Sequence, residues 1–409
     1  MAEPSVRILR DDERAAASRV VNLGMLGPVH DEVSEGWAEL IEANRSHGAF
    51  TAAEELVGLA RFFPTVLSVP GGEVPAAGVT AVAVVSTHRR QGHLTRLMHA
   101  QLQAIADEQI PVALLVAAEW PIYGRYGYGP AIDACRYEID AATARFVSPP
   151  SGAVELVTPA ELRPHLEAVH EARRVRTAGA IRREAMVWDR IAGVAVWPGQ
   201  TLDPGPQRGA LWRDDTGAVQ GAVAYKVDDA WVRNRPAGRA EVGLLVGATP
   251  TAERELWRHL CEIDWVQRVS AGNRGVDDPL PFFVDDGRST TSHDHFDCIW
   301  ARILDVPGTI GARRSLTAGT VVIDVADPLG FATGRWRIEL APDGAEVAPT
   351  TATPDVSLPV AALGALFLGG RSARRLHEAG WIDETLPGGV ERLDAALRTA
   401  EAPWSPTTY

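Results

Sequence analysis

The stretch VAVVSTHRRQGHL, residues 82–94, joins an apolar strand to the start of a helix. Apolar residues recur at a helical spacing over residues 92–107, which predicts one amphipathic helix there. The first turn of a helix has unpaired N–H groups and about half a positive charge, so it attracts anions. Gly92 lets the backbone approach a ligand, and Arg89 and Arg90 add positive charge. The residues alone leave two interpretations open, a diphosphate site and a solvated basic turn.

The composition is that of a folded protein with an acidic balance. The chain has 409 residues, which suggests two to four domains at roughly 100 to 200 residues each, and 46% of them are hydrophobic. No apolar run approaches the ~20 residues that a membrane-spanning helix needs, and the N-terminus shows no secretory signal. We therefore expect a cytoplasmic protein with no membrane partner. The formal net charge of −13 disfavours nucleic acid and favours a cationic small molecule or partner.

The chain divides by pattern into three segments. Residues 1–145 alternate strand-like and helix-like stretches, and a proline-rich stretch at residues 148–152 indicates a linker. Residues 146–296 repeat the strand-then-helix order. Residues 297–409 begin with short strand-like stretches, the first at residues 299–304, and end with helices. The first two segments therefore predict α/β folds, and the third predicts an α+β domain.

Cysteine and histidine usage indicates neither disulfides nor a metal centre. Cys135, Cys261 and Cys298 are widely spaced, and none belongs to a Cys-x-x-Cys pattern. His293 and His295 could supply two ligands on a strand, but no third ligand is signalled nearby. We therefore expect reduced thiols and no metal.

Two motifs together resemble the GCN5-related N-acetyltransferase (GNAT) superfamily. Arg89, Arg90, Gly92 and Leu94 match the R-R-x-G-x-L loop that holds the pyrophosphate of acetyl-CoA in those enzymes. A second landmark of the superfamily, centred on a tyrosine, is similar to IYGRYGY at residues 122–128. This phrase, the length and the three-part layout narrow the resemblance to the enhanced intracellular survival (Eis) family of actinobacteria. That resemblance implies two tandem GNAT folds, the second degenerate, followed by a sterol-carrier-like α+β domain, and it implies a homohexamer.

The resemblance also implies an activity and a set of site residues. The expected activity is acetyl transfer from acetyl-CoA to primary amines, namely aminoglycosides, polyamines or lysine side chains. Tyr123 would protonate the departing thiolate, and the terminal carboxylate of Tyr409 would act as base or relay, with a mobile tail as the alternative. Trp37 would line the substrate pocket, with core packing as the alternative. The residues implied to hold acetyl-CoA are Val82, Ala83, Val84, Arg90, Gln91, Gly92, His93, Leu94, Thr95, Ala118 and Glu119.

Two departures from the family pattern limit these expectations. Thr408 stands where an acidic residue would help to hold a polycation, which disfavours aminoglycosides. The second segment has no R-R-x-G-x-L loop and carries Glu253 in the corresponding region, where a carboxylate would repel a pyrophosphate, so we expect one active site per chain. The competing interpretations are transfer of a different acyl group and a lipid- or sterol-binding carrier with a degenerate acyltransferase domain.

Overall fold

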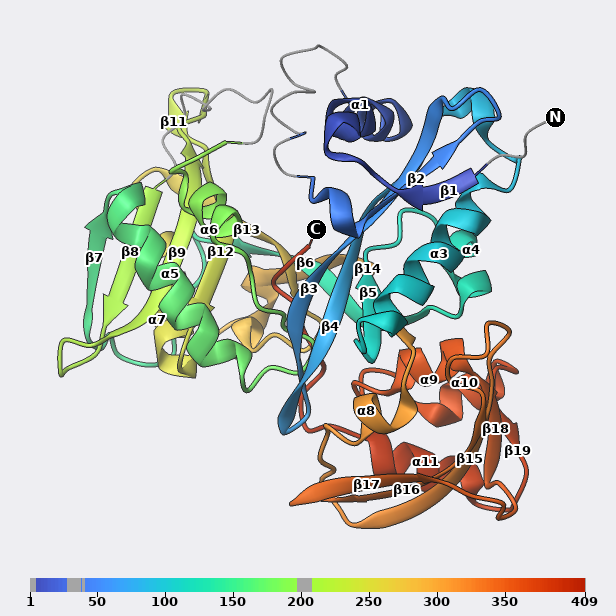
Figure 1. The fold of residues 1–409 in the computed structure, drawn as a ribbon. Coiled ribbons are helices and arrows are strands. Elements are labelled where there is room, and N and C mark those ends of the chain that lie inside the picture. Colours follow the sequence, from blue (N-terminus) through green and yellow to red (C-terminus); the bar gives the residue numbers. More distant parts are fainter. Residues whose placement is uncertain (1–4, 28–37, 39–40, 197–207, 409) are drawn as a thin grey trace.

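The computed structural model describes residues 5–27, 38, 41–196 and 208–408. Trp37 and Tyr409 lie outside the described residues. The described chain forms two α/β halves that share one sheet, and a third unit packs beside them (Figure 1). No helix in this described part is long and apolar enough to cross a membrane.

The first half consists of an antiparallel run of strands followed by helices and a parallel strand. Its elements are β1 (Ser5–Ile8), α1 (Arg14–Gly24), β2 (Ser46–Phe50), β3 (Leu56–Val69), β4 (Gly72–Val84), α3 (His93–Asp107), β5 (Val112–Leu115), α4 (Trp120–Tyr123) and β6 (Gly129–Asp140). Strand β3 continues through Pro64 without a break. Strand β2 pairs with β3 only as far as Arg61, so the missing N–H of Pro64 costs no bond to β2.

The second half repeats this order with the same kinds of elements. They are β7 (Ala153–Val157), α5 (Pro159–Arg174), α6 (Ala185–Ala192), β8 (Arg208–Arg213), β9 (Val219–Asp228), the short hairpin β10 (Trp231–Val232) and β11 (Arg235–Pro236), β12 (Gly238–Gly247), α7 (Pro250–Cys261), β13 (Val266–Gly275) and β14 (Thr290–Ile303). Helix α5 begins with the capping box of Thr158 and Glu161, which pairs backbone N–H groups at its start.

The two halves exchange their last strands. The twelve-stranded sheet has the order β1-β2-β3-β4-β5-β14-β6-β13-β12-β9-β8-β7, so β14 separates β5 from β6, and β6 pairs with β13. The segment at residues 299–304, expected in the sheet of the third domain, belongs instead to β14 and pairs with β5. The expected boundary between residues 296 and 297 therefore falls inside a strand. The apolar residues at the end of β14 predict a buried strand, but they do not indicate which of the two sheets the strand joins.

The third unit is an α+β fold with its own five-stranded sheet in the order β17-β16-β15-β18-β19. Its elements are α8 (Val306–Ile310), β15 (Gly319–Ala326), β16 (Gly334–Ala341), β17 (Gly344–Pro349), β18 (Val356–Pro359), α9 (Val360–Leu366), α10 (Ala373–Glu378), β19 (Asp383–Glu384) and α11 (Gly389–Leu397). The predicted class, two α/β folds followed by an α+β domain, is confirmed.

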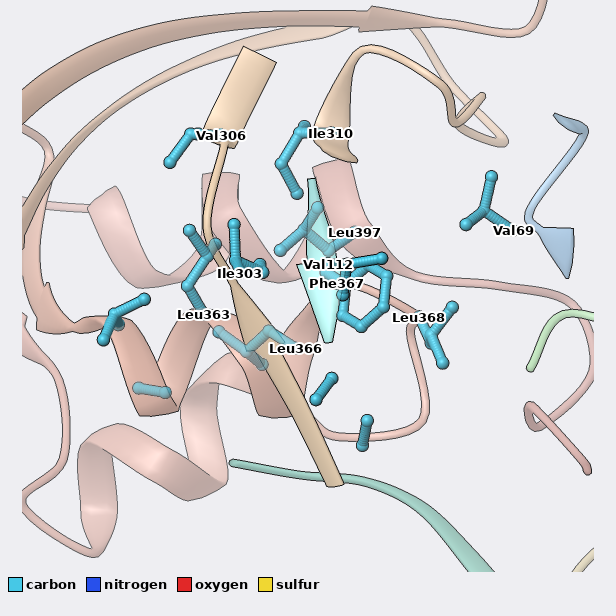
Figure 2. Close-up of a cluster of buried hydrophobic side chains, with 14 of the residues drawn as sticks. Val69, Val112, Ile303, Val306, Ile310, Leu363, Leu366, Phe367, Leu368 and Leu397 are labelled. Atoms are coloured by element: carbon cyan, nitrogen blue, oxygen red, sulfur yellow. The ribbon is translucent and has the colours of Figure 1, made fainter. Parts of the chain in front are cut away.

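Helix α9 joins the third unit to the shared sheet. Leu363, Leu366 and Phe367 are buried with Ile303 of β14 in one apolar cluster (Figure 2). The helix approaches the sheet closely because of a glycine, since a Cβ at Gly129 would overlap the carbonyl oxygen of Ala361. The third unit thus supports β6 and β14, the two strands that the halves exchange.

A buried ion pair crosses the same junction and gives a stability prediction. Arg302 of β14 donates from Nη2 to both carboxylate oxygens of Asp327 at 2.8 Å, and both side chains are fully buried. Substitution of Arg302 by methionine leaves that carboxylate buried without its partner, so we expect a loss of about 3–5 kcal/mol in the free energy of unfolding. Urea unfolding measures the loss. Arg337→Met, which breaks an exposed pair with Glu339, is the control and should cost less than about 1 kcal/mol. Equal losses in the two variants would contradict the prediction.

Candidate active site

A bulge in β4 opens the sheet at the centre of the first half. The register of β3 and β4 shifts between Leu59 and Arg61, and Ala81 of β4 has a φ of 53°. Beyond the bulge β4 also leaves its parallel neighbour, because the last pair that it forms with β5 is Gly78 with Leu114. The two strands therefore diverge, and the backbone of β4 that follows is available to a ligand.

The turn after β4 leads directly into α3. Arg90 and Gly92 have φ values of 63° and 80°, and Gly92 precedes the helix without a side chain that caps it. The N–H groups of the first helical turn are thus left for an external acceptor, and the helix dipole favours an anion there. Arg89 donates to the carbonyl oxygens of Val84 and Gly24 at 3.3 Å, so its side chain fastens the turn to β4 and α1.

A cleft of about 710 Å³ runs from this turn along β4 to α4. It is lined by most of the residues implied to hold the cofactor, namely Val82, Ala83, Val84, Arg90, Gly92, His93, Leu94, Thr95, Ala118 and Glu119. Gln91 is exposed and does not line the cleft; its carbonyl oxygen accepts a bond from Arg96 Nη2 at 3.2 Å. The cleft is also lined by two residues that were not expected there, Met25 after α1 and Tyr126. Tyr126 lies within the tyrosine motif, so the motif could have indicated it.

Tyr123 lies at the far end of the cleft as the last residue of α4. Its side chain is 7% exposed, and its hydroxyl makes no hydrogen bond within the described part of the chain. Burial raises the pKa of Tyr123 to about 12, and the neighbouring Tyr126 and Glu119 act in the same direction. The phenol is therefore fully protonated at neutral pH. Tyr126 also lines the cleft, but its hydroxyl is within 3.2 Å of Thr95 Oγ1.

A second cavity of about 350 Å³ lies against the other side of the β4 bulge. It shares the lining residues Met25, Thr80 and Ala81 with the cleft, so the two spaces adjoin at the bulge. The C-terminal segment, red in Figure 1, rises between the two α/β halves, and Thr407 and Thr408 line this cavity. An acceptor held here would face the end of a ligand that extends along the cleft.

Buried contacts hold the C-terminal segment in place as far as Thr407. The backbone N–H of Trp404 donates to the carbonyl oxygen of Ala178 at 2.8 Å, and its indole N–H donates to Asn273 at 3.0 Å. Arg183 Nε donates to Thr407 Oγ1 at 2.7 Å, and Arg183 Nη2 donates to the carbonyl oxygen of Pro406. These contacts keep the end of the chain beside the second cavity.

In the second half the corresponding helix is α7, and side chains of the chain itself lie at its start. Thr249 Oγ1 accepts a bond from the N–H of Ala252 at the start of α7. Glu253 is buried, and Arg274 lies 3.7 Å from its carboxylate. A carboxyl group of the chain itself thus lies near the start of α7. The start of α3, at the corresponding place in the first half, has free N–H groups instead. The second half has no comparable anion site among the described residues of this region, in line with one active site per chain.

The histidines considered as metal ligands form an exposed polar segment. His293 Nδ1 lies 3.1 Å from a carboxylate oxygen of Asp294, and both side chains are exposed. Across the described ranges, no group of three or more His, Cys, Asp or Glu side chains is placed to hold a metal ion.

Comparison with known families identifies the class of protein. Residues 5–131 and residues 179–303 each match a family model for an acetyltransferase (GNAT) domain, and residues 306–406 match one for a sterol carrier protein domain. The third match begins after β14, as the sheet pairing requires. The fold and the cleft therefore define an N-acetyltransferase with tandem GNAT folds and a sterol-carrier-like domain.

Similar proteins narrow the class to one family. An uncharacterized N-acetyltransferase of Streptomyces avermitilis is 38% identical and covers 99% of this chain and 98% of its own. N-acetyltransferase Eis of Mycobacterium tuberculosis is 34% identical over 84% of this chain and 83% of its own. The crystal structure of Eis1 from Mycobacterium abscessus superposes with a TM-score of 0.86 at 32% identity, covering 99% of this chain and 100% of that one. The chain belongs to the Eis family.

Proposed function

We propose that this N-acetyltransferase moves the acetyl group of acetyl-CoA to a primary amine by direct attack of the amine on the thioester. The observation that carries the proposal is the junction of the two spaces at the β4 bulge. The cleft starts at the uncapped end of α3 and ends at Tyr123, and the second cavity opens at the bulge between them. Donor and acceptor would therefore meet at the bulge.

The start of α3 is the proposed pyrophosphate site. Its free N–H groups and the helix dipole would bind the linked phosphates, with Arg90 adding charge at the rim. The pantetheine arm would extend along the backbone of residues 82–84, where β4 has parted from β5. Backbone N–H groups of that strand would polarise the thioester carbonyl in the manner of an oxyanion hole.

Tyr123 is the proposed acid for the leaving group. The amine nitrogen attacks the thioester carbon, the carbon–sulfur bond breaks, and the sulfur takes the phenolic proton. The phenol has a pKa of about 12 and a thiol a pKa of about 8.5, so proton transfer from Tyr123 to a fully formed thiolate is uphill by about 5 kcal/mol. The proton would therefore have to move while the carbon–sulfur bond is breaking. The proton released by the amine would return to the phenolate through water.

The terminal carboxylate of Tyr409 is the proposed relay for the amine proton. An α-carboxyl with a pKa of about 3.5 is too weak a base to deprotonate an alkyl ammonium with a pKa of about 10.4 directly. It would instead attract the ammonium and order a water molecule. Thr407, which Arg183 anchors, and Thr408 after it both line the second cavity, and this supports the role.

An extension of the C-terminus tests the relay. Adding three residues after Tyr409 moves the carboxylate away from the cavity, so we expect kcat to fall about ten-fold or more, as for other small displacements of catalytic groups. Calorimetry should show unchanged affinity for acetyl-CoA, since the cleft is untouched. An extended chain with the kcat of the original would remove Tyr409 from the mechanism.

Release of free thiol from acetyl-CoA in the presence of a panel of amines tests the proposed function itself. Turnover with at least one amine is the expected result, and the absence of turnover together with the absence of acetyl-CoA binding would refute it. In the lipid-carrier alternative the third unit would bind the lipid, but the buried side chains drawn in Figure 2 pack against one another and against β5 and β14. Stabilisation by a hydrophobic ligand but not by acetyl-CoA in a thermal shift experiment would favour that alternative.

A further inference from the structure

The second half keeps the strand geometry that opens a cleft in the first half. Strands β12 and β13 are parallel neighbours, as β4 and β5 are, and their last pair is Val242 with Ala271. The register of β12 against β9 shifts between Val242 and Leu244, as that of β4 against β3 shifts at its bulge. The ends of β12 and β13 therefore diverge, as the ends of β4 and β5 do.

An arginine spans the gap between these two strand ends. Arg274 of β13 is buried, and its Nη1 donates to the carbonyl oxygen of Leu245 in β12 at 3.1 Å. Its Nε donates to the carboxylate of Asp278 at 2.6 Å, and the carboxylate of Glu253 in α7 lies 3.7 Å from Nη2. These contacts from three sides fix the orientation of the guanidinium. The chain itself thus occupies the place where the first half has its cofactor cleft.

The same guanidinium supports the C-terminal segment. Arg274 Cζ lies 4.8 Å from the centre of the Trp404 ring, which is a cation–π contact. Trp404 is 6% exposed, and its indole and backbone N–H groups donate to the carbonyl oxygens of Asn273 and Ala178. All of these partners belong to the second half, so the second half fixes the position of Trp404.

Trp404 is close in sequence to the active site but is not part of its walls. The described linings of the cleft and of the second cavity include neither Trp404 nor Arg274. Thr407, three residues later, does line the second cavity, and its N–H donates to Ser405 Oγ at 3.3 Å in a tight turn. Five residues span at most about 18 Å, so the place of Trp404 limits where the terminal carboxylate can lie.

We propose that the second half is an anchor for the catalytic C-terminus, in which Arg274 and Trp404 are positioning residues for the terminal carboxylate. This inference rests on the proposed function, because it assumes that the carboxylate acts at the site of the first half. The arginine that fills the gap between β12 and β13 is also the support on which Trp404 lies. One arrangement therefore closes the second half to a cofactor and completes the active site of the first half.

Trp404→Leu tests the anchor, since leucine keeps an apolar side chain but has neither the aromatic ring nor the indole N–H. We expect kcat to fall about five-fold or more, because the carboxylate is no longer held in one place. Calorimetry should show unchanged affinity for acetyl-CoA, because the substitution leaves the cleft intact. An unchanged kcat would overturn the inference.

Trp212→Leu is the matched control. Trp212 of β8 is 4% exposed, and its indole N–H donates to the carbonyl oxygen of Ser151 at 2.8 Å, so the substitution removes a buried ring and the same kind of bond from the second half. We expect a comparable loss of thermal stability in both variants, and an unchanged kcat in the control at a temperature where both are folded. Equal losses of kcat would mean that the second half acts only through overall stability, and would overturn the inference.

Combining Trp404→Leu with the three-residue extension shows whether the anchor acts through the carboxylate. The extension already displaces that group, so we expect the double variant to have the kcat of the extended chain within about two-fold. Losses that multiply would overturn the inference and leave the relay in place. An extension that has no effect of its own would remove the relay, and the inference would fail with it, whereas acetyl transfer would stand.

Hydrogen exchange covers the case in which no tested amine reacts. The amides of residues 400–408 should exchange about ten-fold faster in the Trp404→Leu variant than in the parent, and at the parent rate in the Trp212→Leu control. Faster exchange confined to the Trp404 variant supports the anchor, and equal rates in all three proteins overturn it. Binding of acetyl-CoA, measured separately, tests the proposed function and does not depend on this result.

Discussion

Tyr123→Phe lowers kcat by about 100-fold or more, because a general acid contributes roughly 10²–10⁴-fold and phenylalanine has no proton to give. The phenol is buried at the end of the cleft. Acetyl-CoA should bind the variant as tightly as the parent, since the start of α3 is unchanged. Steady-state release of free thiol measures kcat, and calorimetry measures the affinity.

Tyr126→Phe is the matched control for this substitution. Tyr126 also lines the cleft, but its hydroxyl is engaged with Thr95 Oγ1, so its loss removes one hydrogen bond and no catalytic proton. We expect kcat to fall by less than about ten-fold, the equivalent of one ordinary hydrogen bond. A larger loss in the Tyr126 variant than in the Tyr123 variant would reverse the two assignments.

The pH dependence of the parent enzyme follows from the direction of the Tyr123 shift. The acid form of a tyrosine is lost as the pH rises through its pKa, and burial raises that pKa to about 12. The profile of kcat/KM should therefore climb as the amine deprotonates and show no alkaline decline below about pH 10, where an ordinary tyrosine would begin to titrate. A decline centred near pH 9 would contradict a buried phenol as the acid.

Local chemistry made most of the first half predictable from sequence. The apolar periodicity of α3, the glycine before it and the arginines of the turn all act within a few residues, so a pattern identifies them. The exchange of β6 and β14 was not predictable, because the buried residues of β6 and residues 298–303 of β14 could pack equally well in either half of the sheet. Strands β6 and β14 pair although they are more than a hundred residues apart in the sequence, so their pairing depends on tertiary packing. Helix α9 packs against β14 and helps to hold that strand in place.

The two parts of the site also differ in how far apart their residues lie in the sequence. The cofactor cleft follows from one turn and one strand, and nearly all of its expected residues line it. The second cavity combines α1, β3, the segment before α6 and the C-terminal segment. No motif in the sequence relates Arg183 to Thr407, although the two share a hydrogen bond.

The contrast between the two halves provides a second substitution of large effect. In α7 a carboxylate, Glu253, occupies the fourth position after the capping residue Thr249. In α3 the fourth position after Gly92 is Arg96, whose Nη1 would lie 3.4 Å from a Cβ placed on Gly92. Arg96→Glu thus gives α3 a carboxyl group at the position where α7 has one. We expect affinity for acetyl-CoA to fall about 30-fold or more, since a carboxylate there both repels the pyrophosphate and takes up N–H groups at the helix start.

Arg96→Gln separates the effect of losing the positive charge of Arg96 from the effect of adding the negative charge of a glutamate. It removes the bond that Arg96 donates to the Gln91 carbonyl and one positive charge, but it places no anion at the turn. A loss of affinity of about five-fold is expected for this variant, the size of a single exposed charge effect. Calorimetry with acetyl-CoA at two salt concentrations measures both variants, and the difference between them should shrink as salt screens the charge. Equal affinities for the glutamate and glutamine variants would mean that the phosphates do not lie at the start of α3, and the proposed orientation of the cofactor along β4 would fail with it.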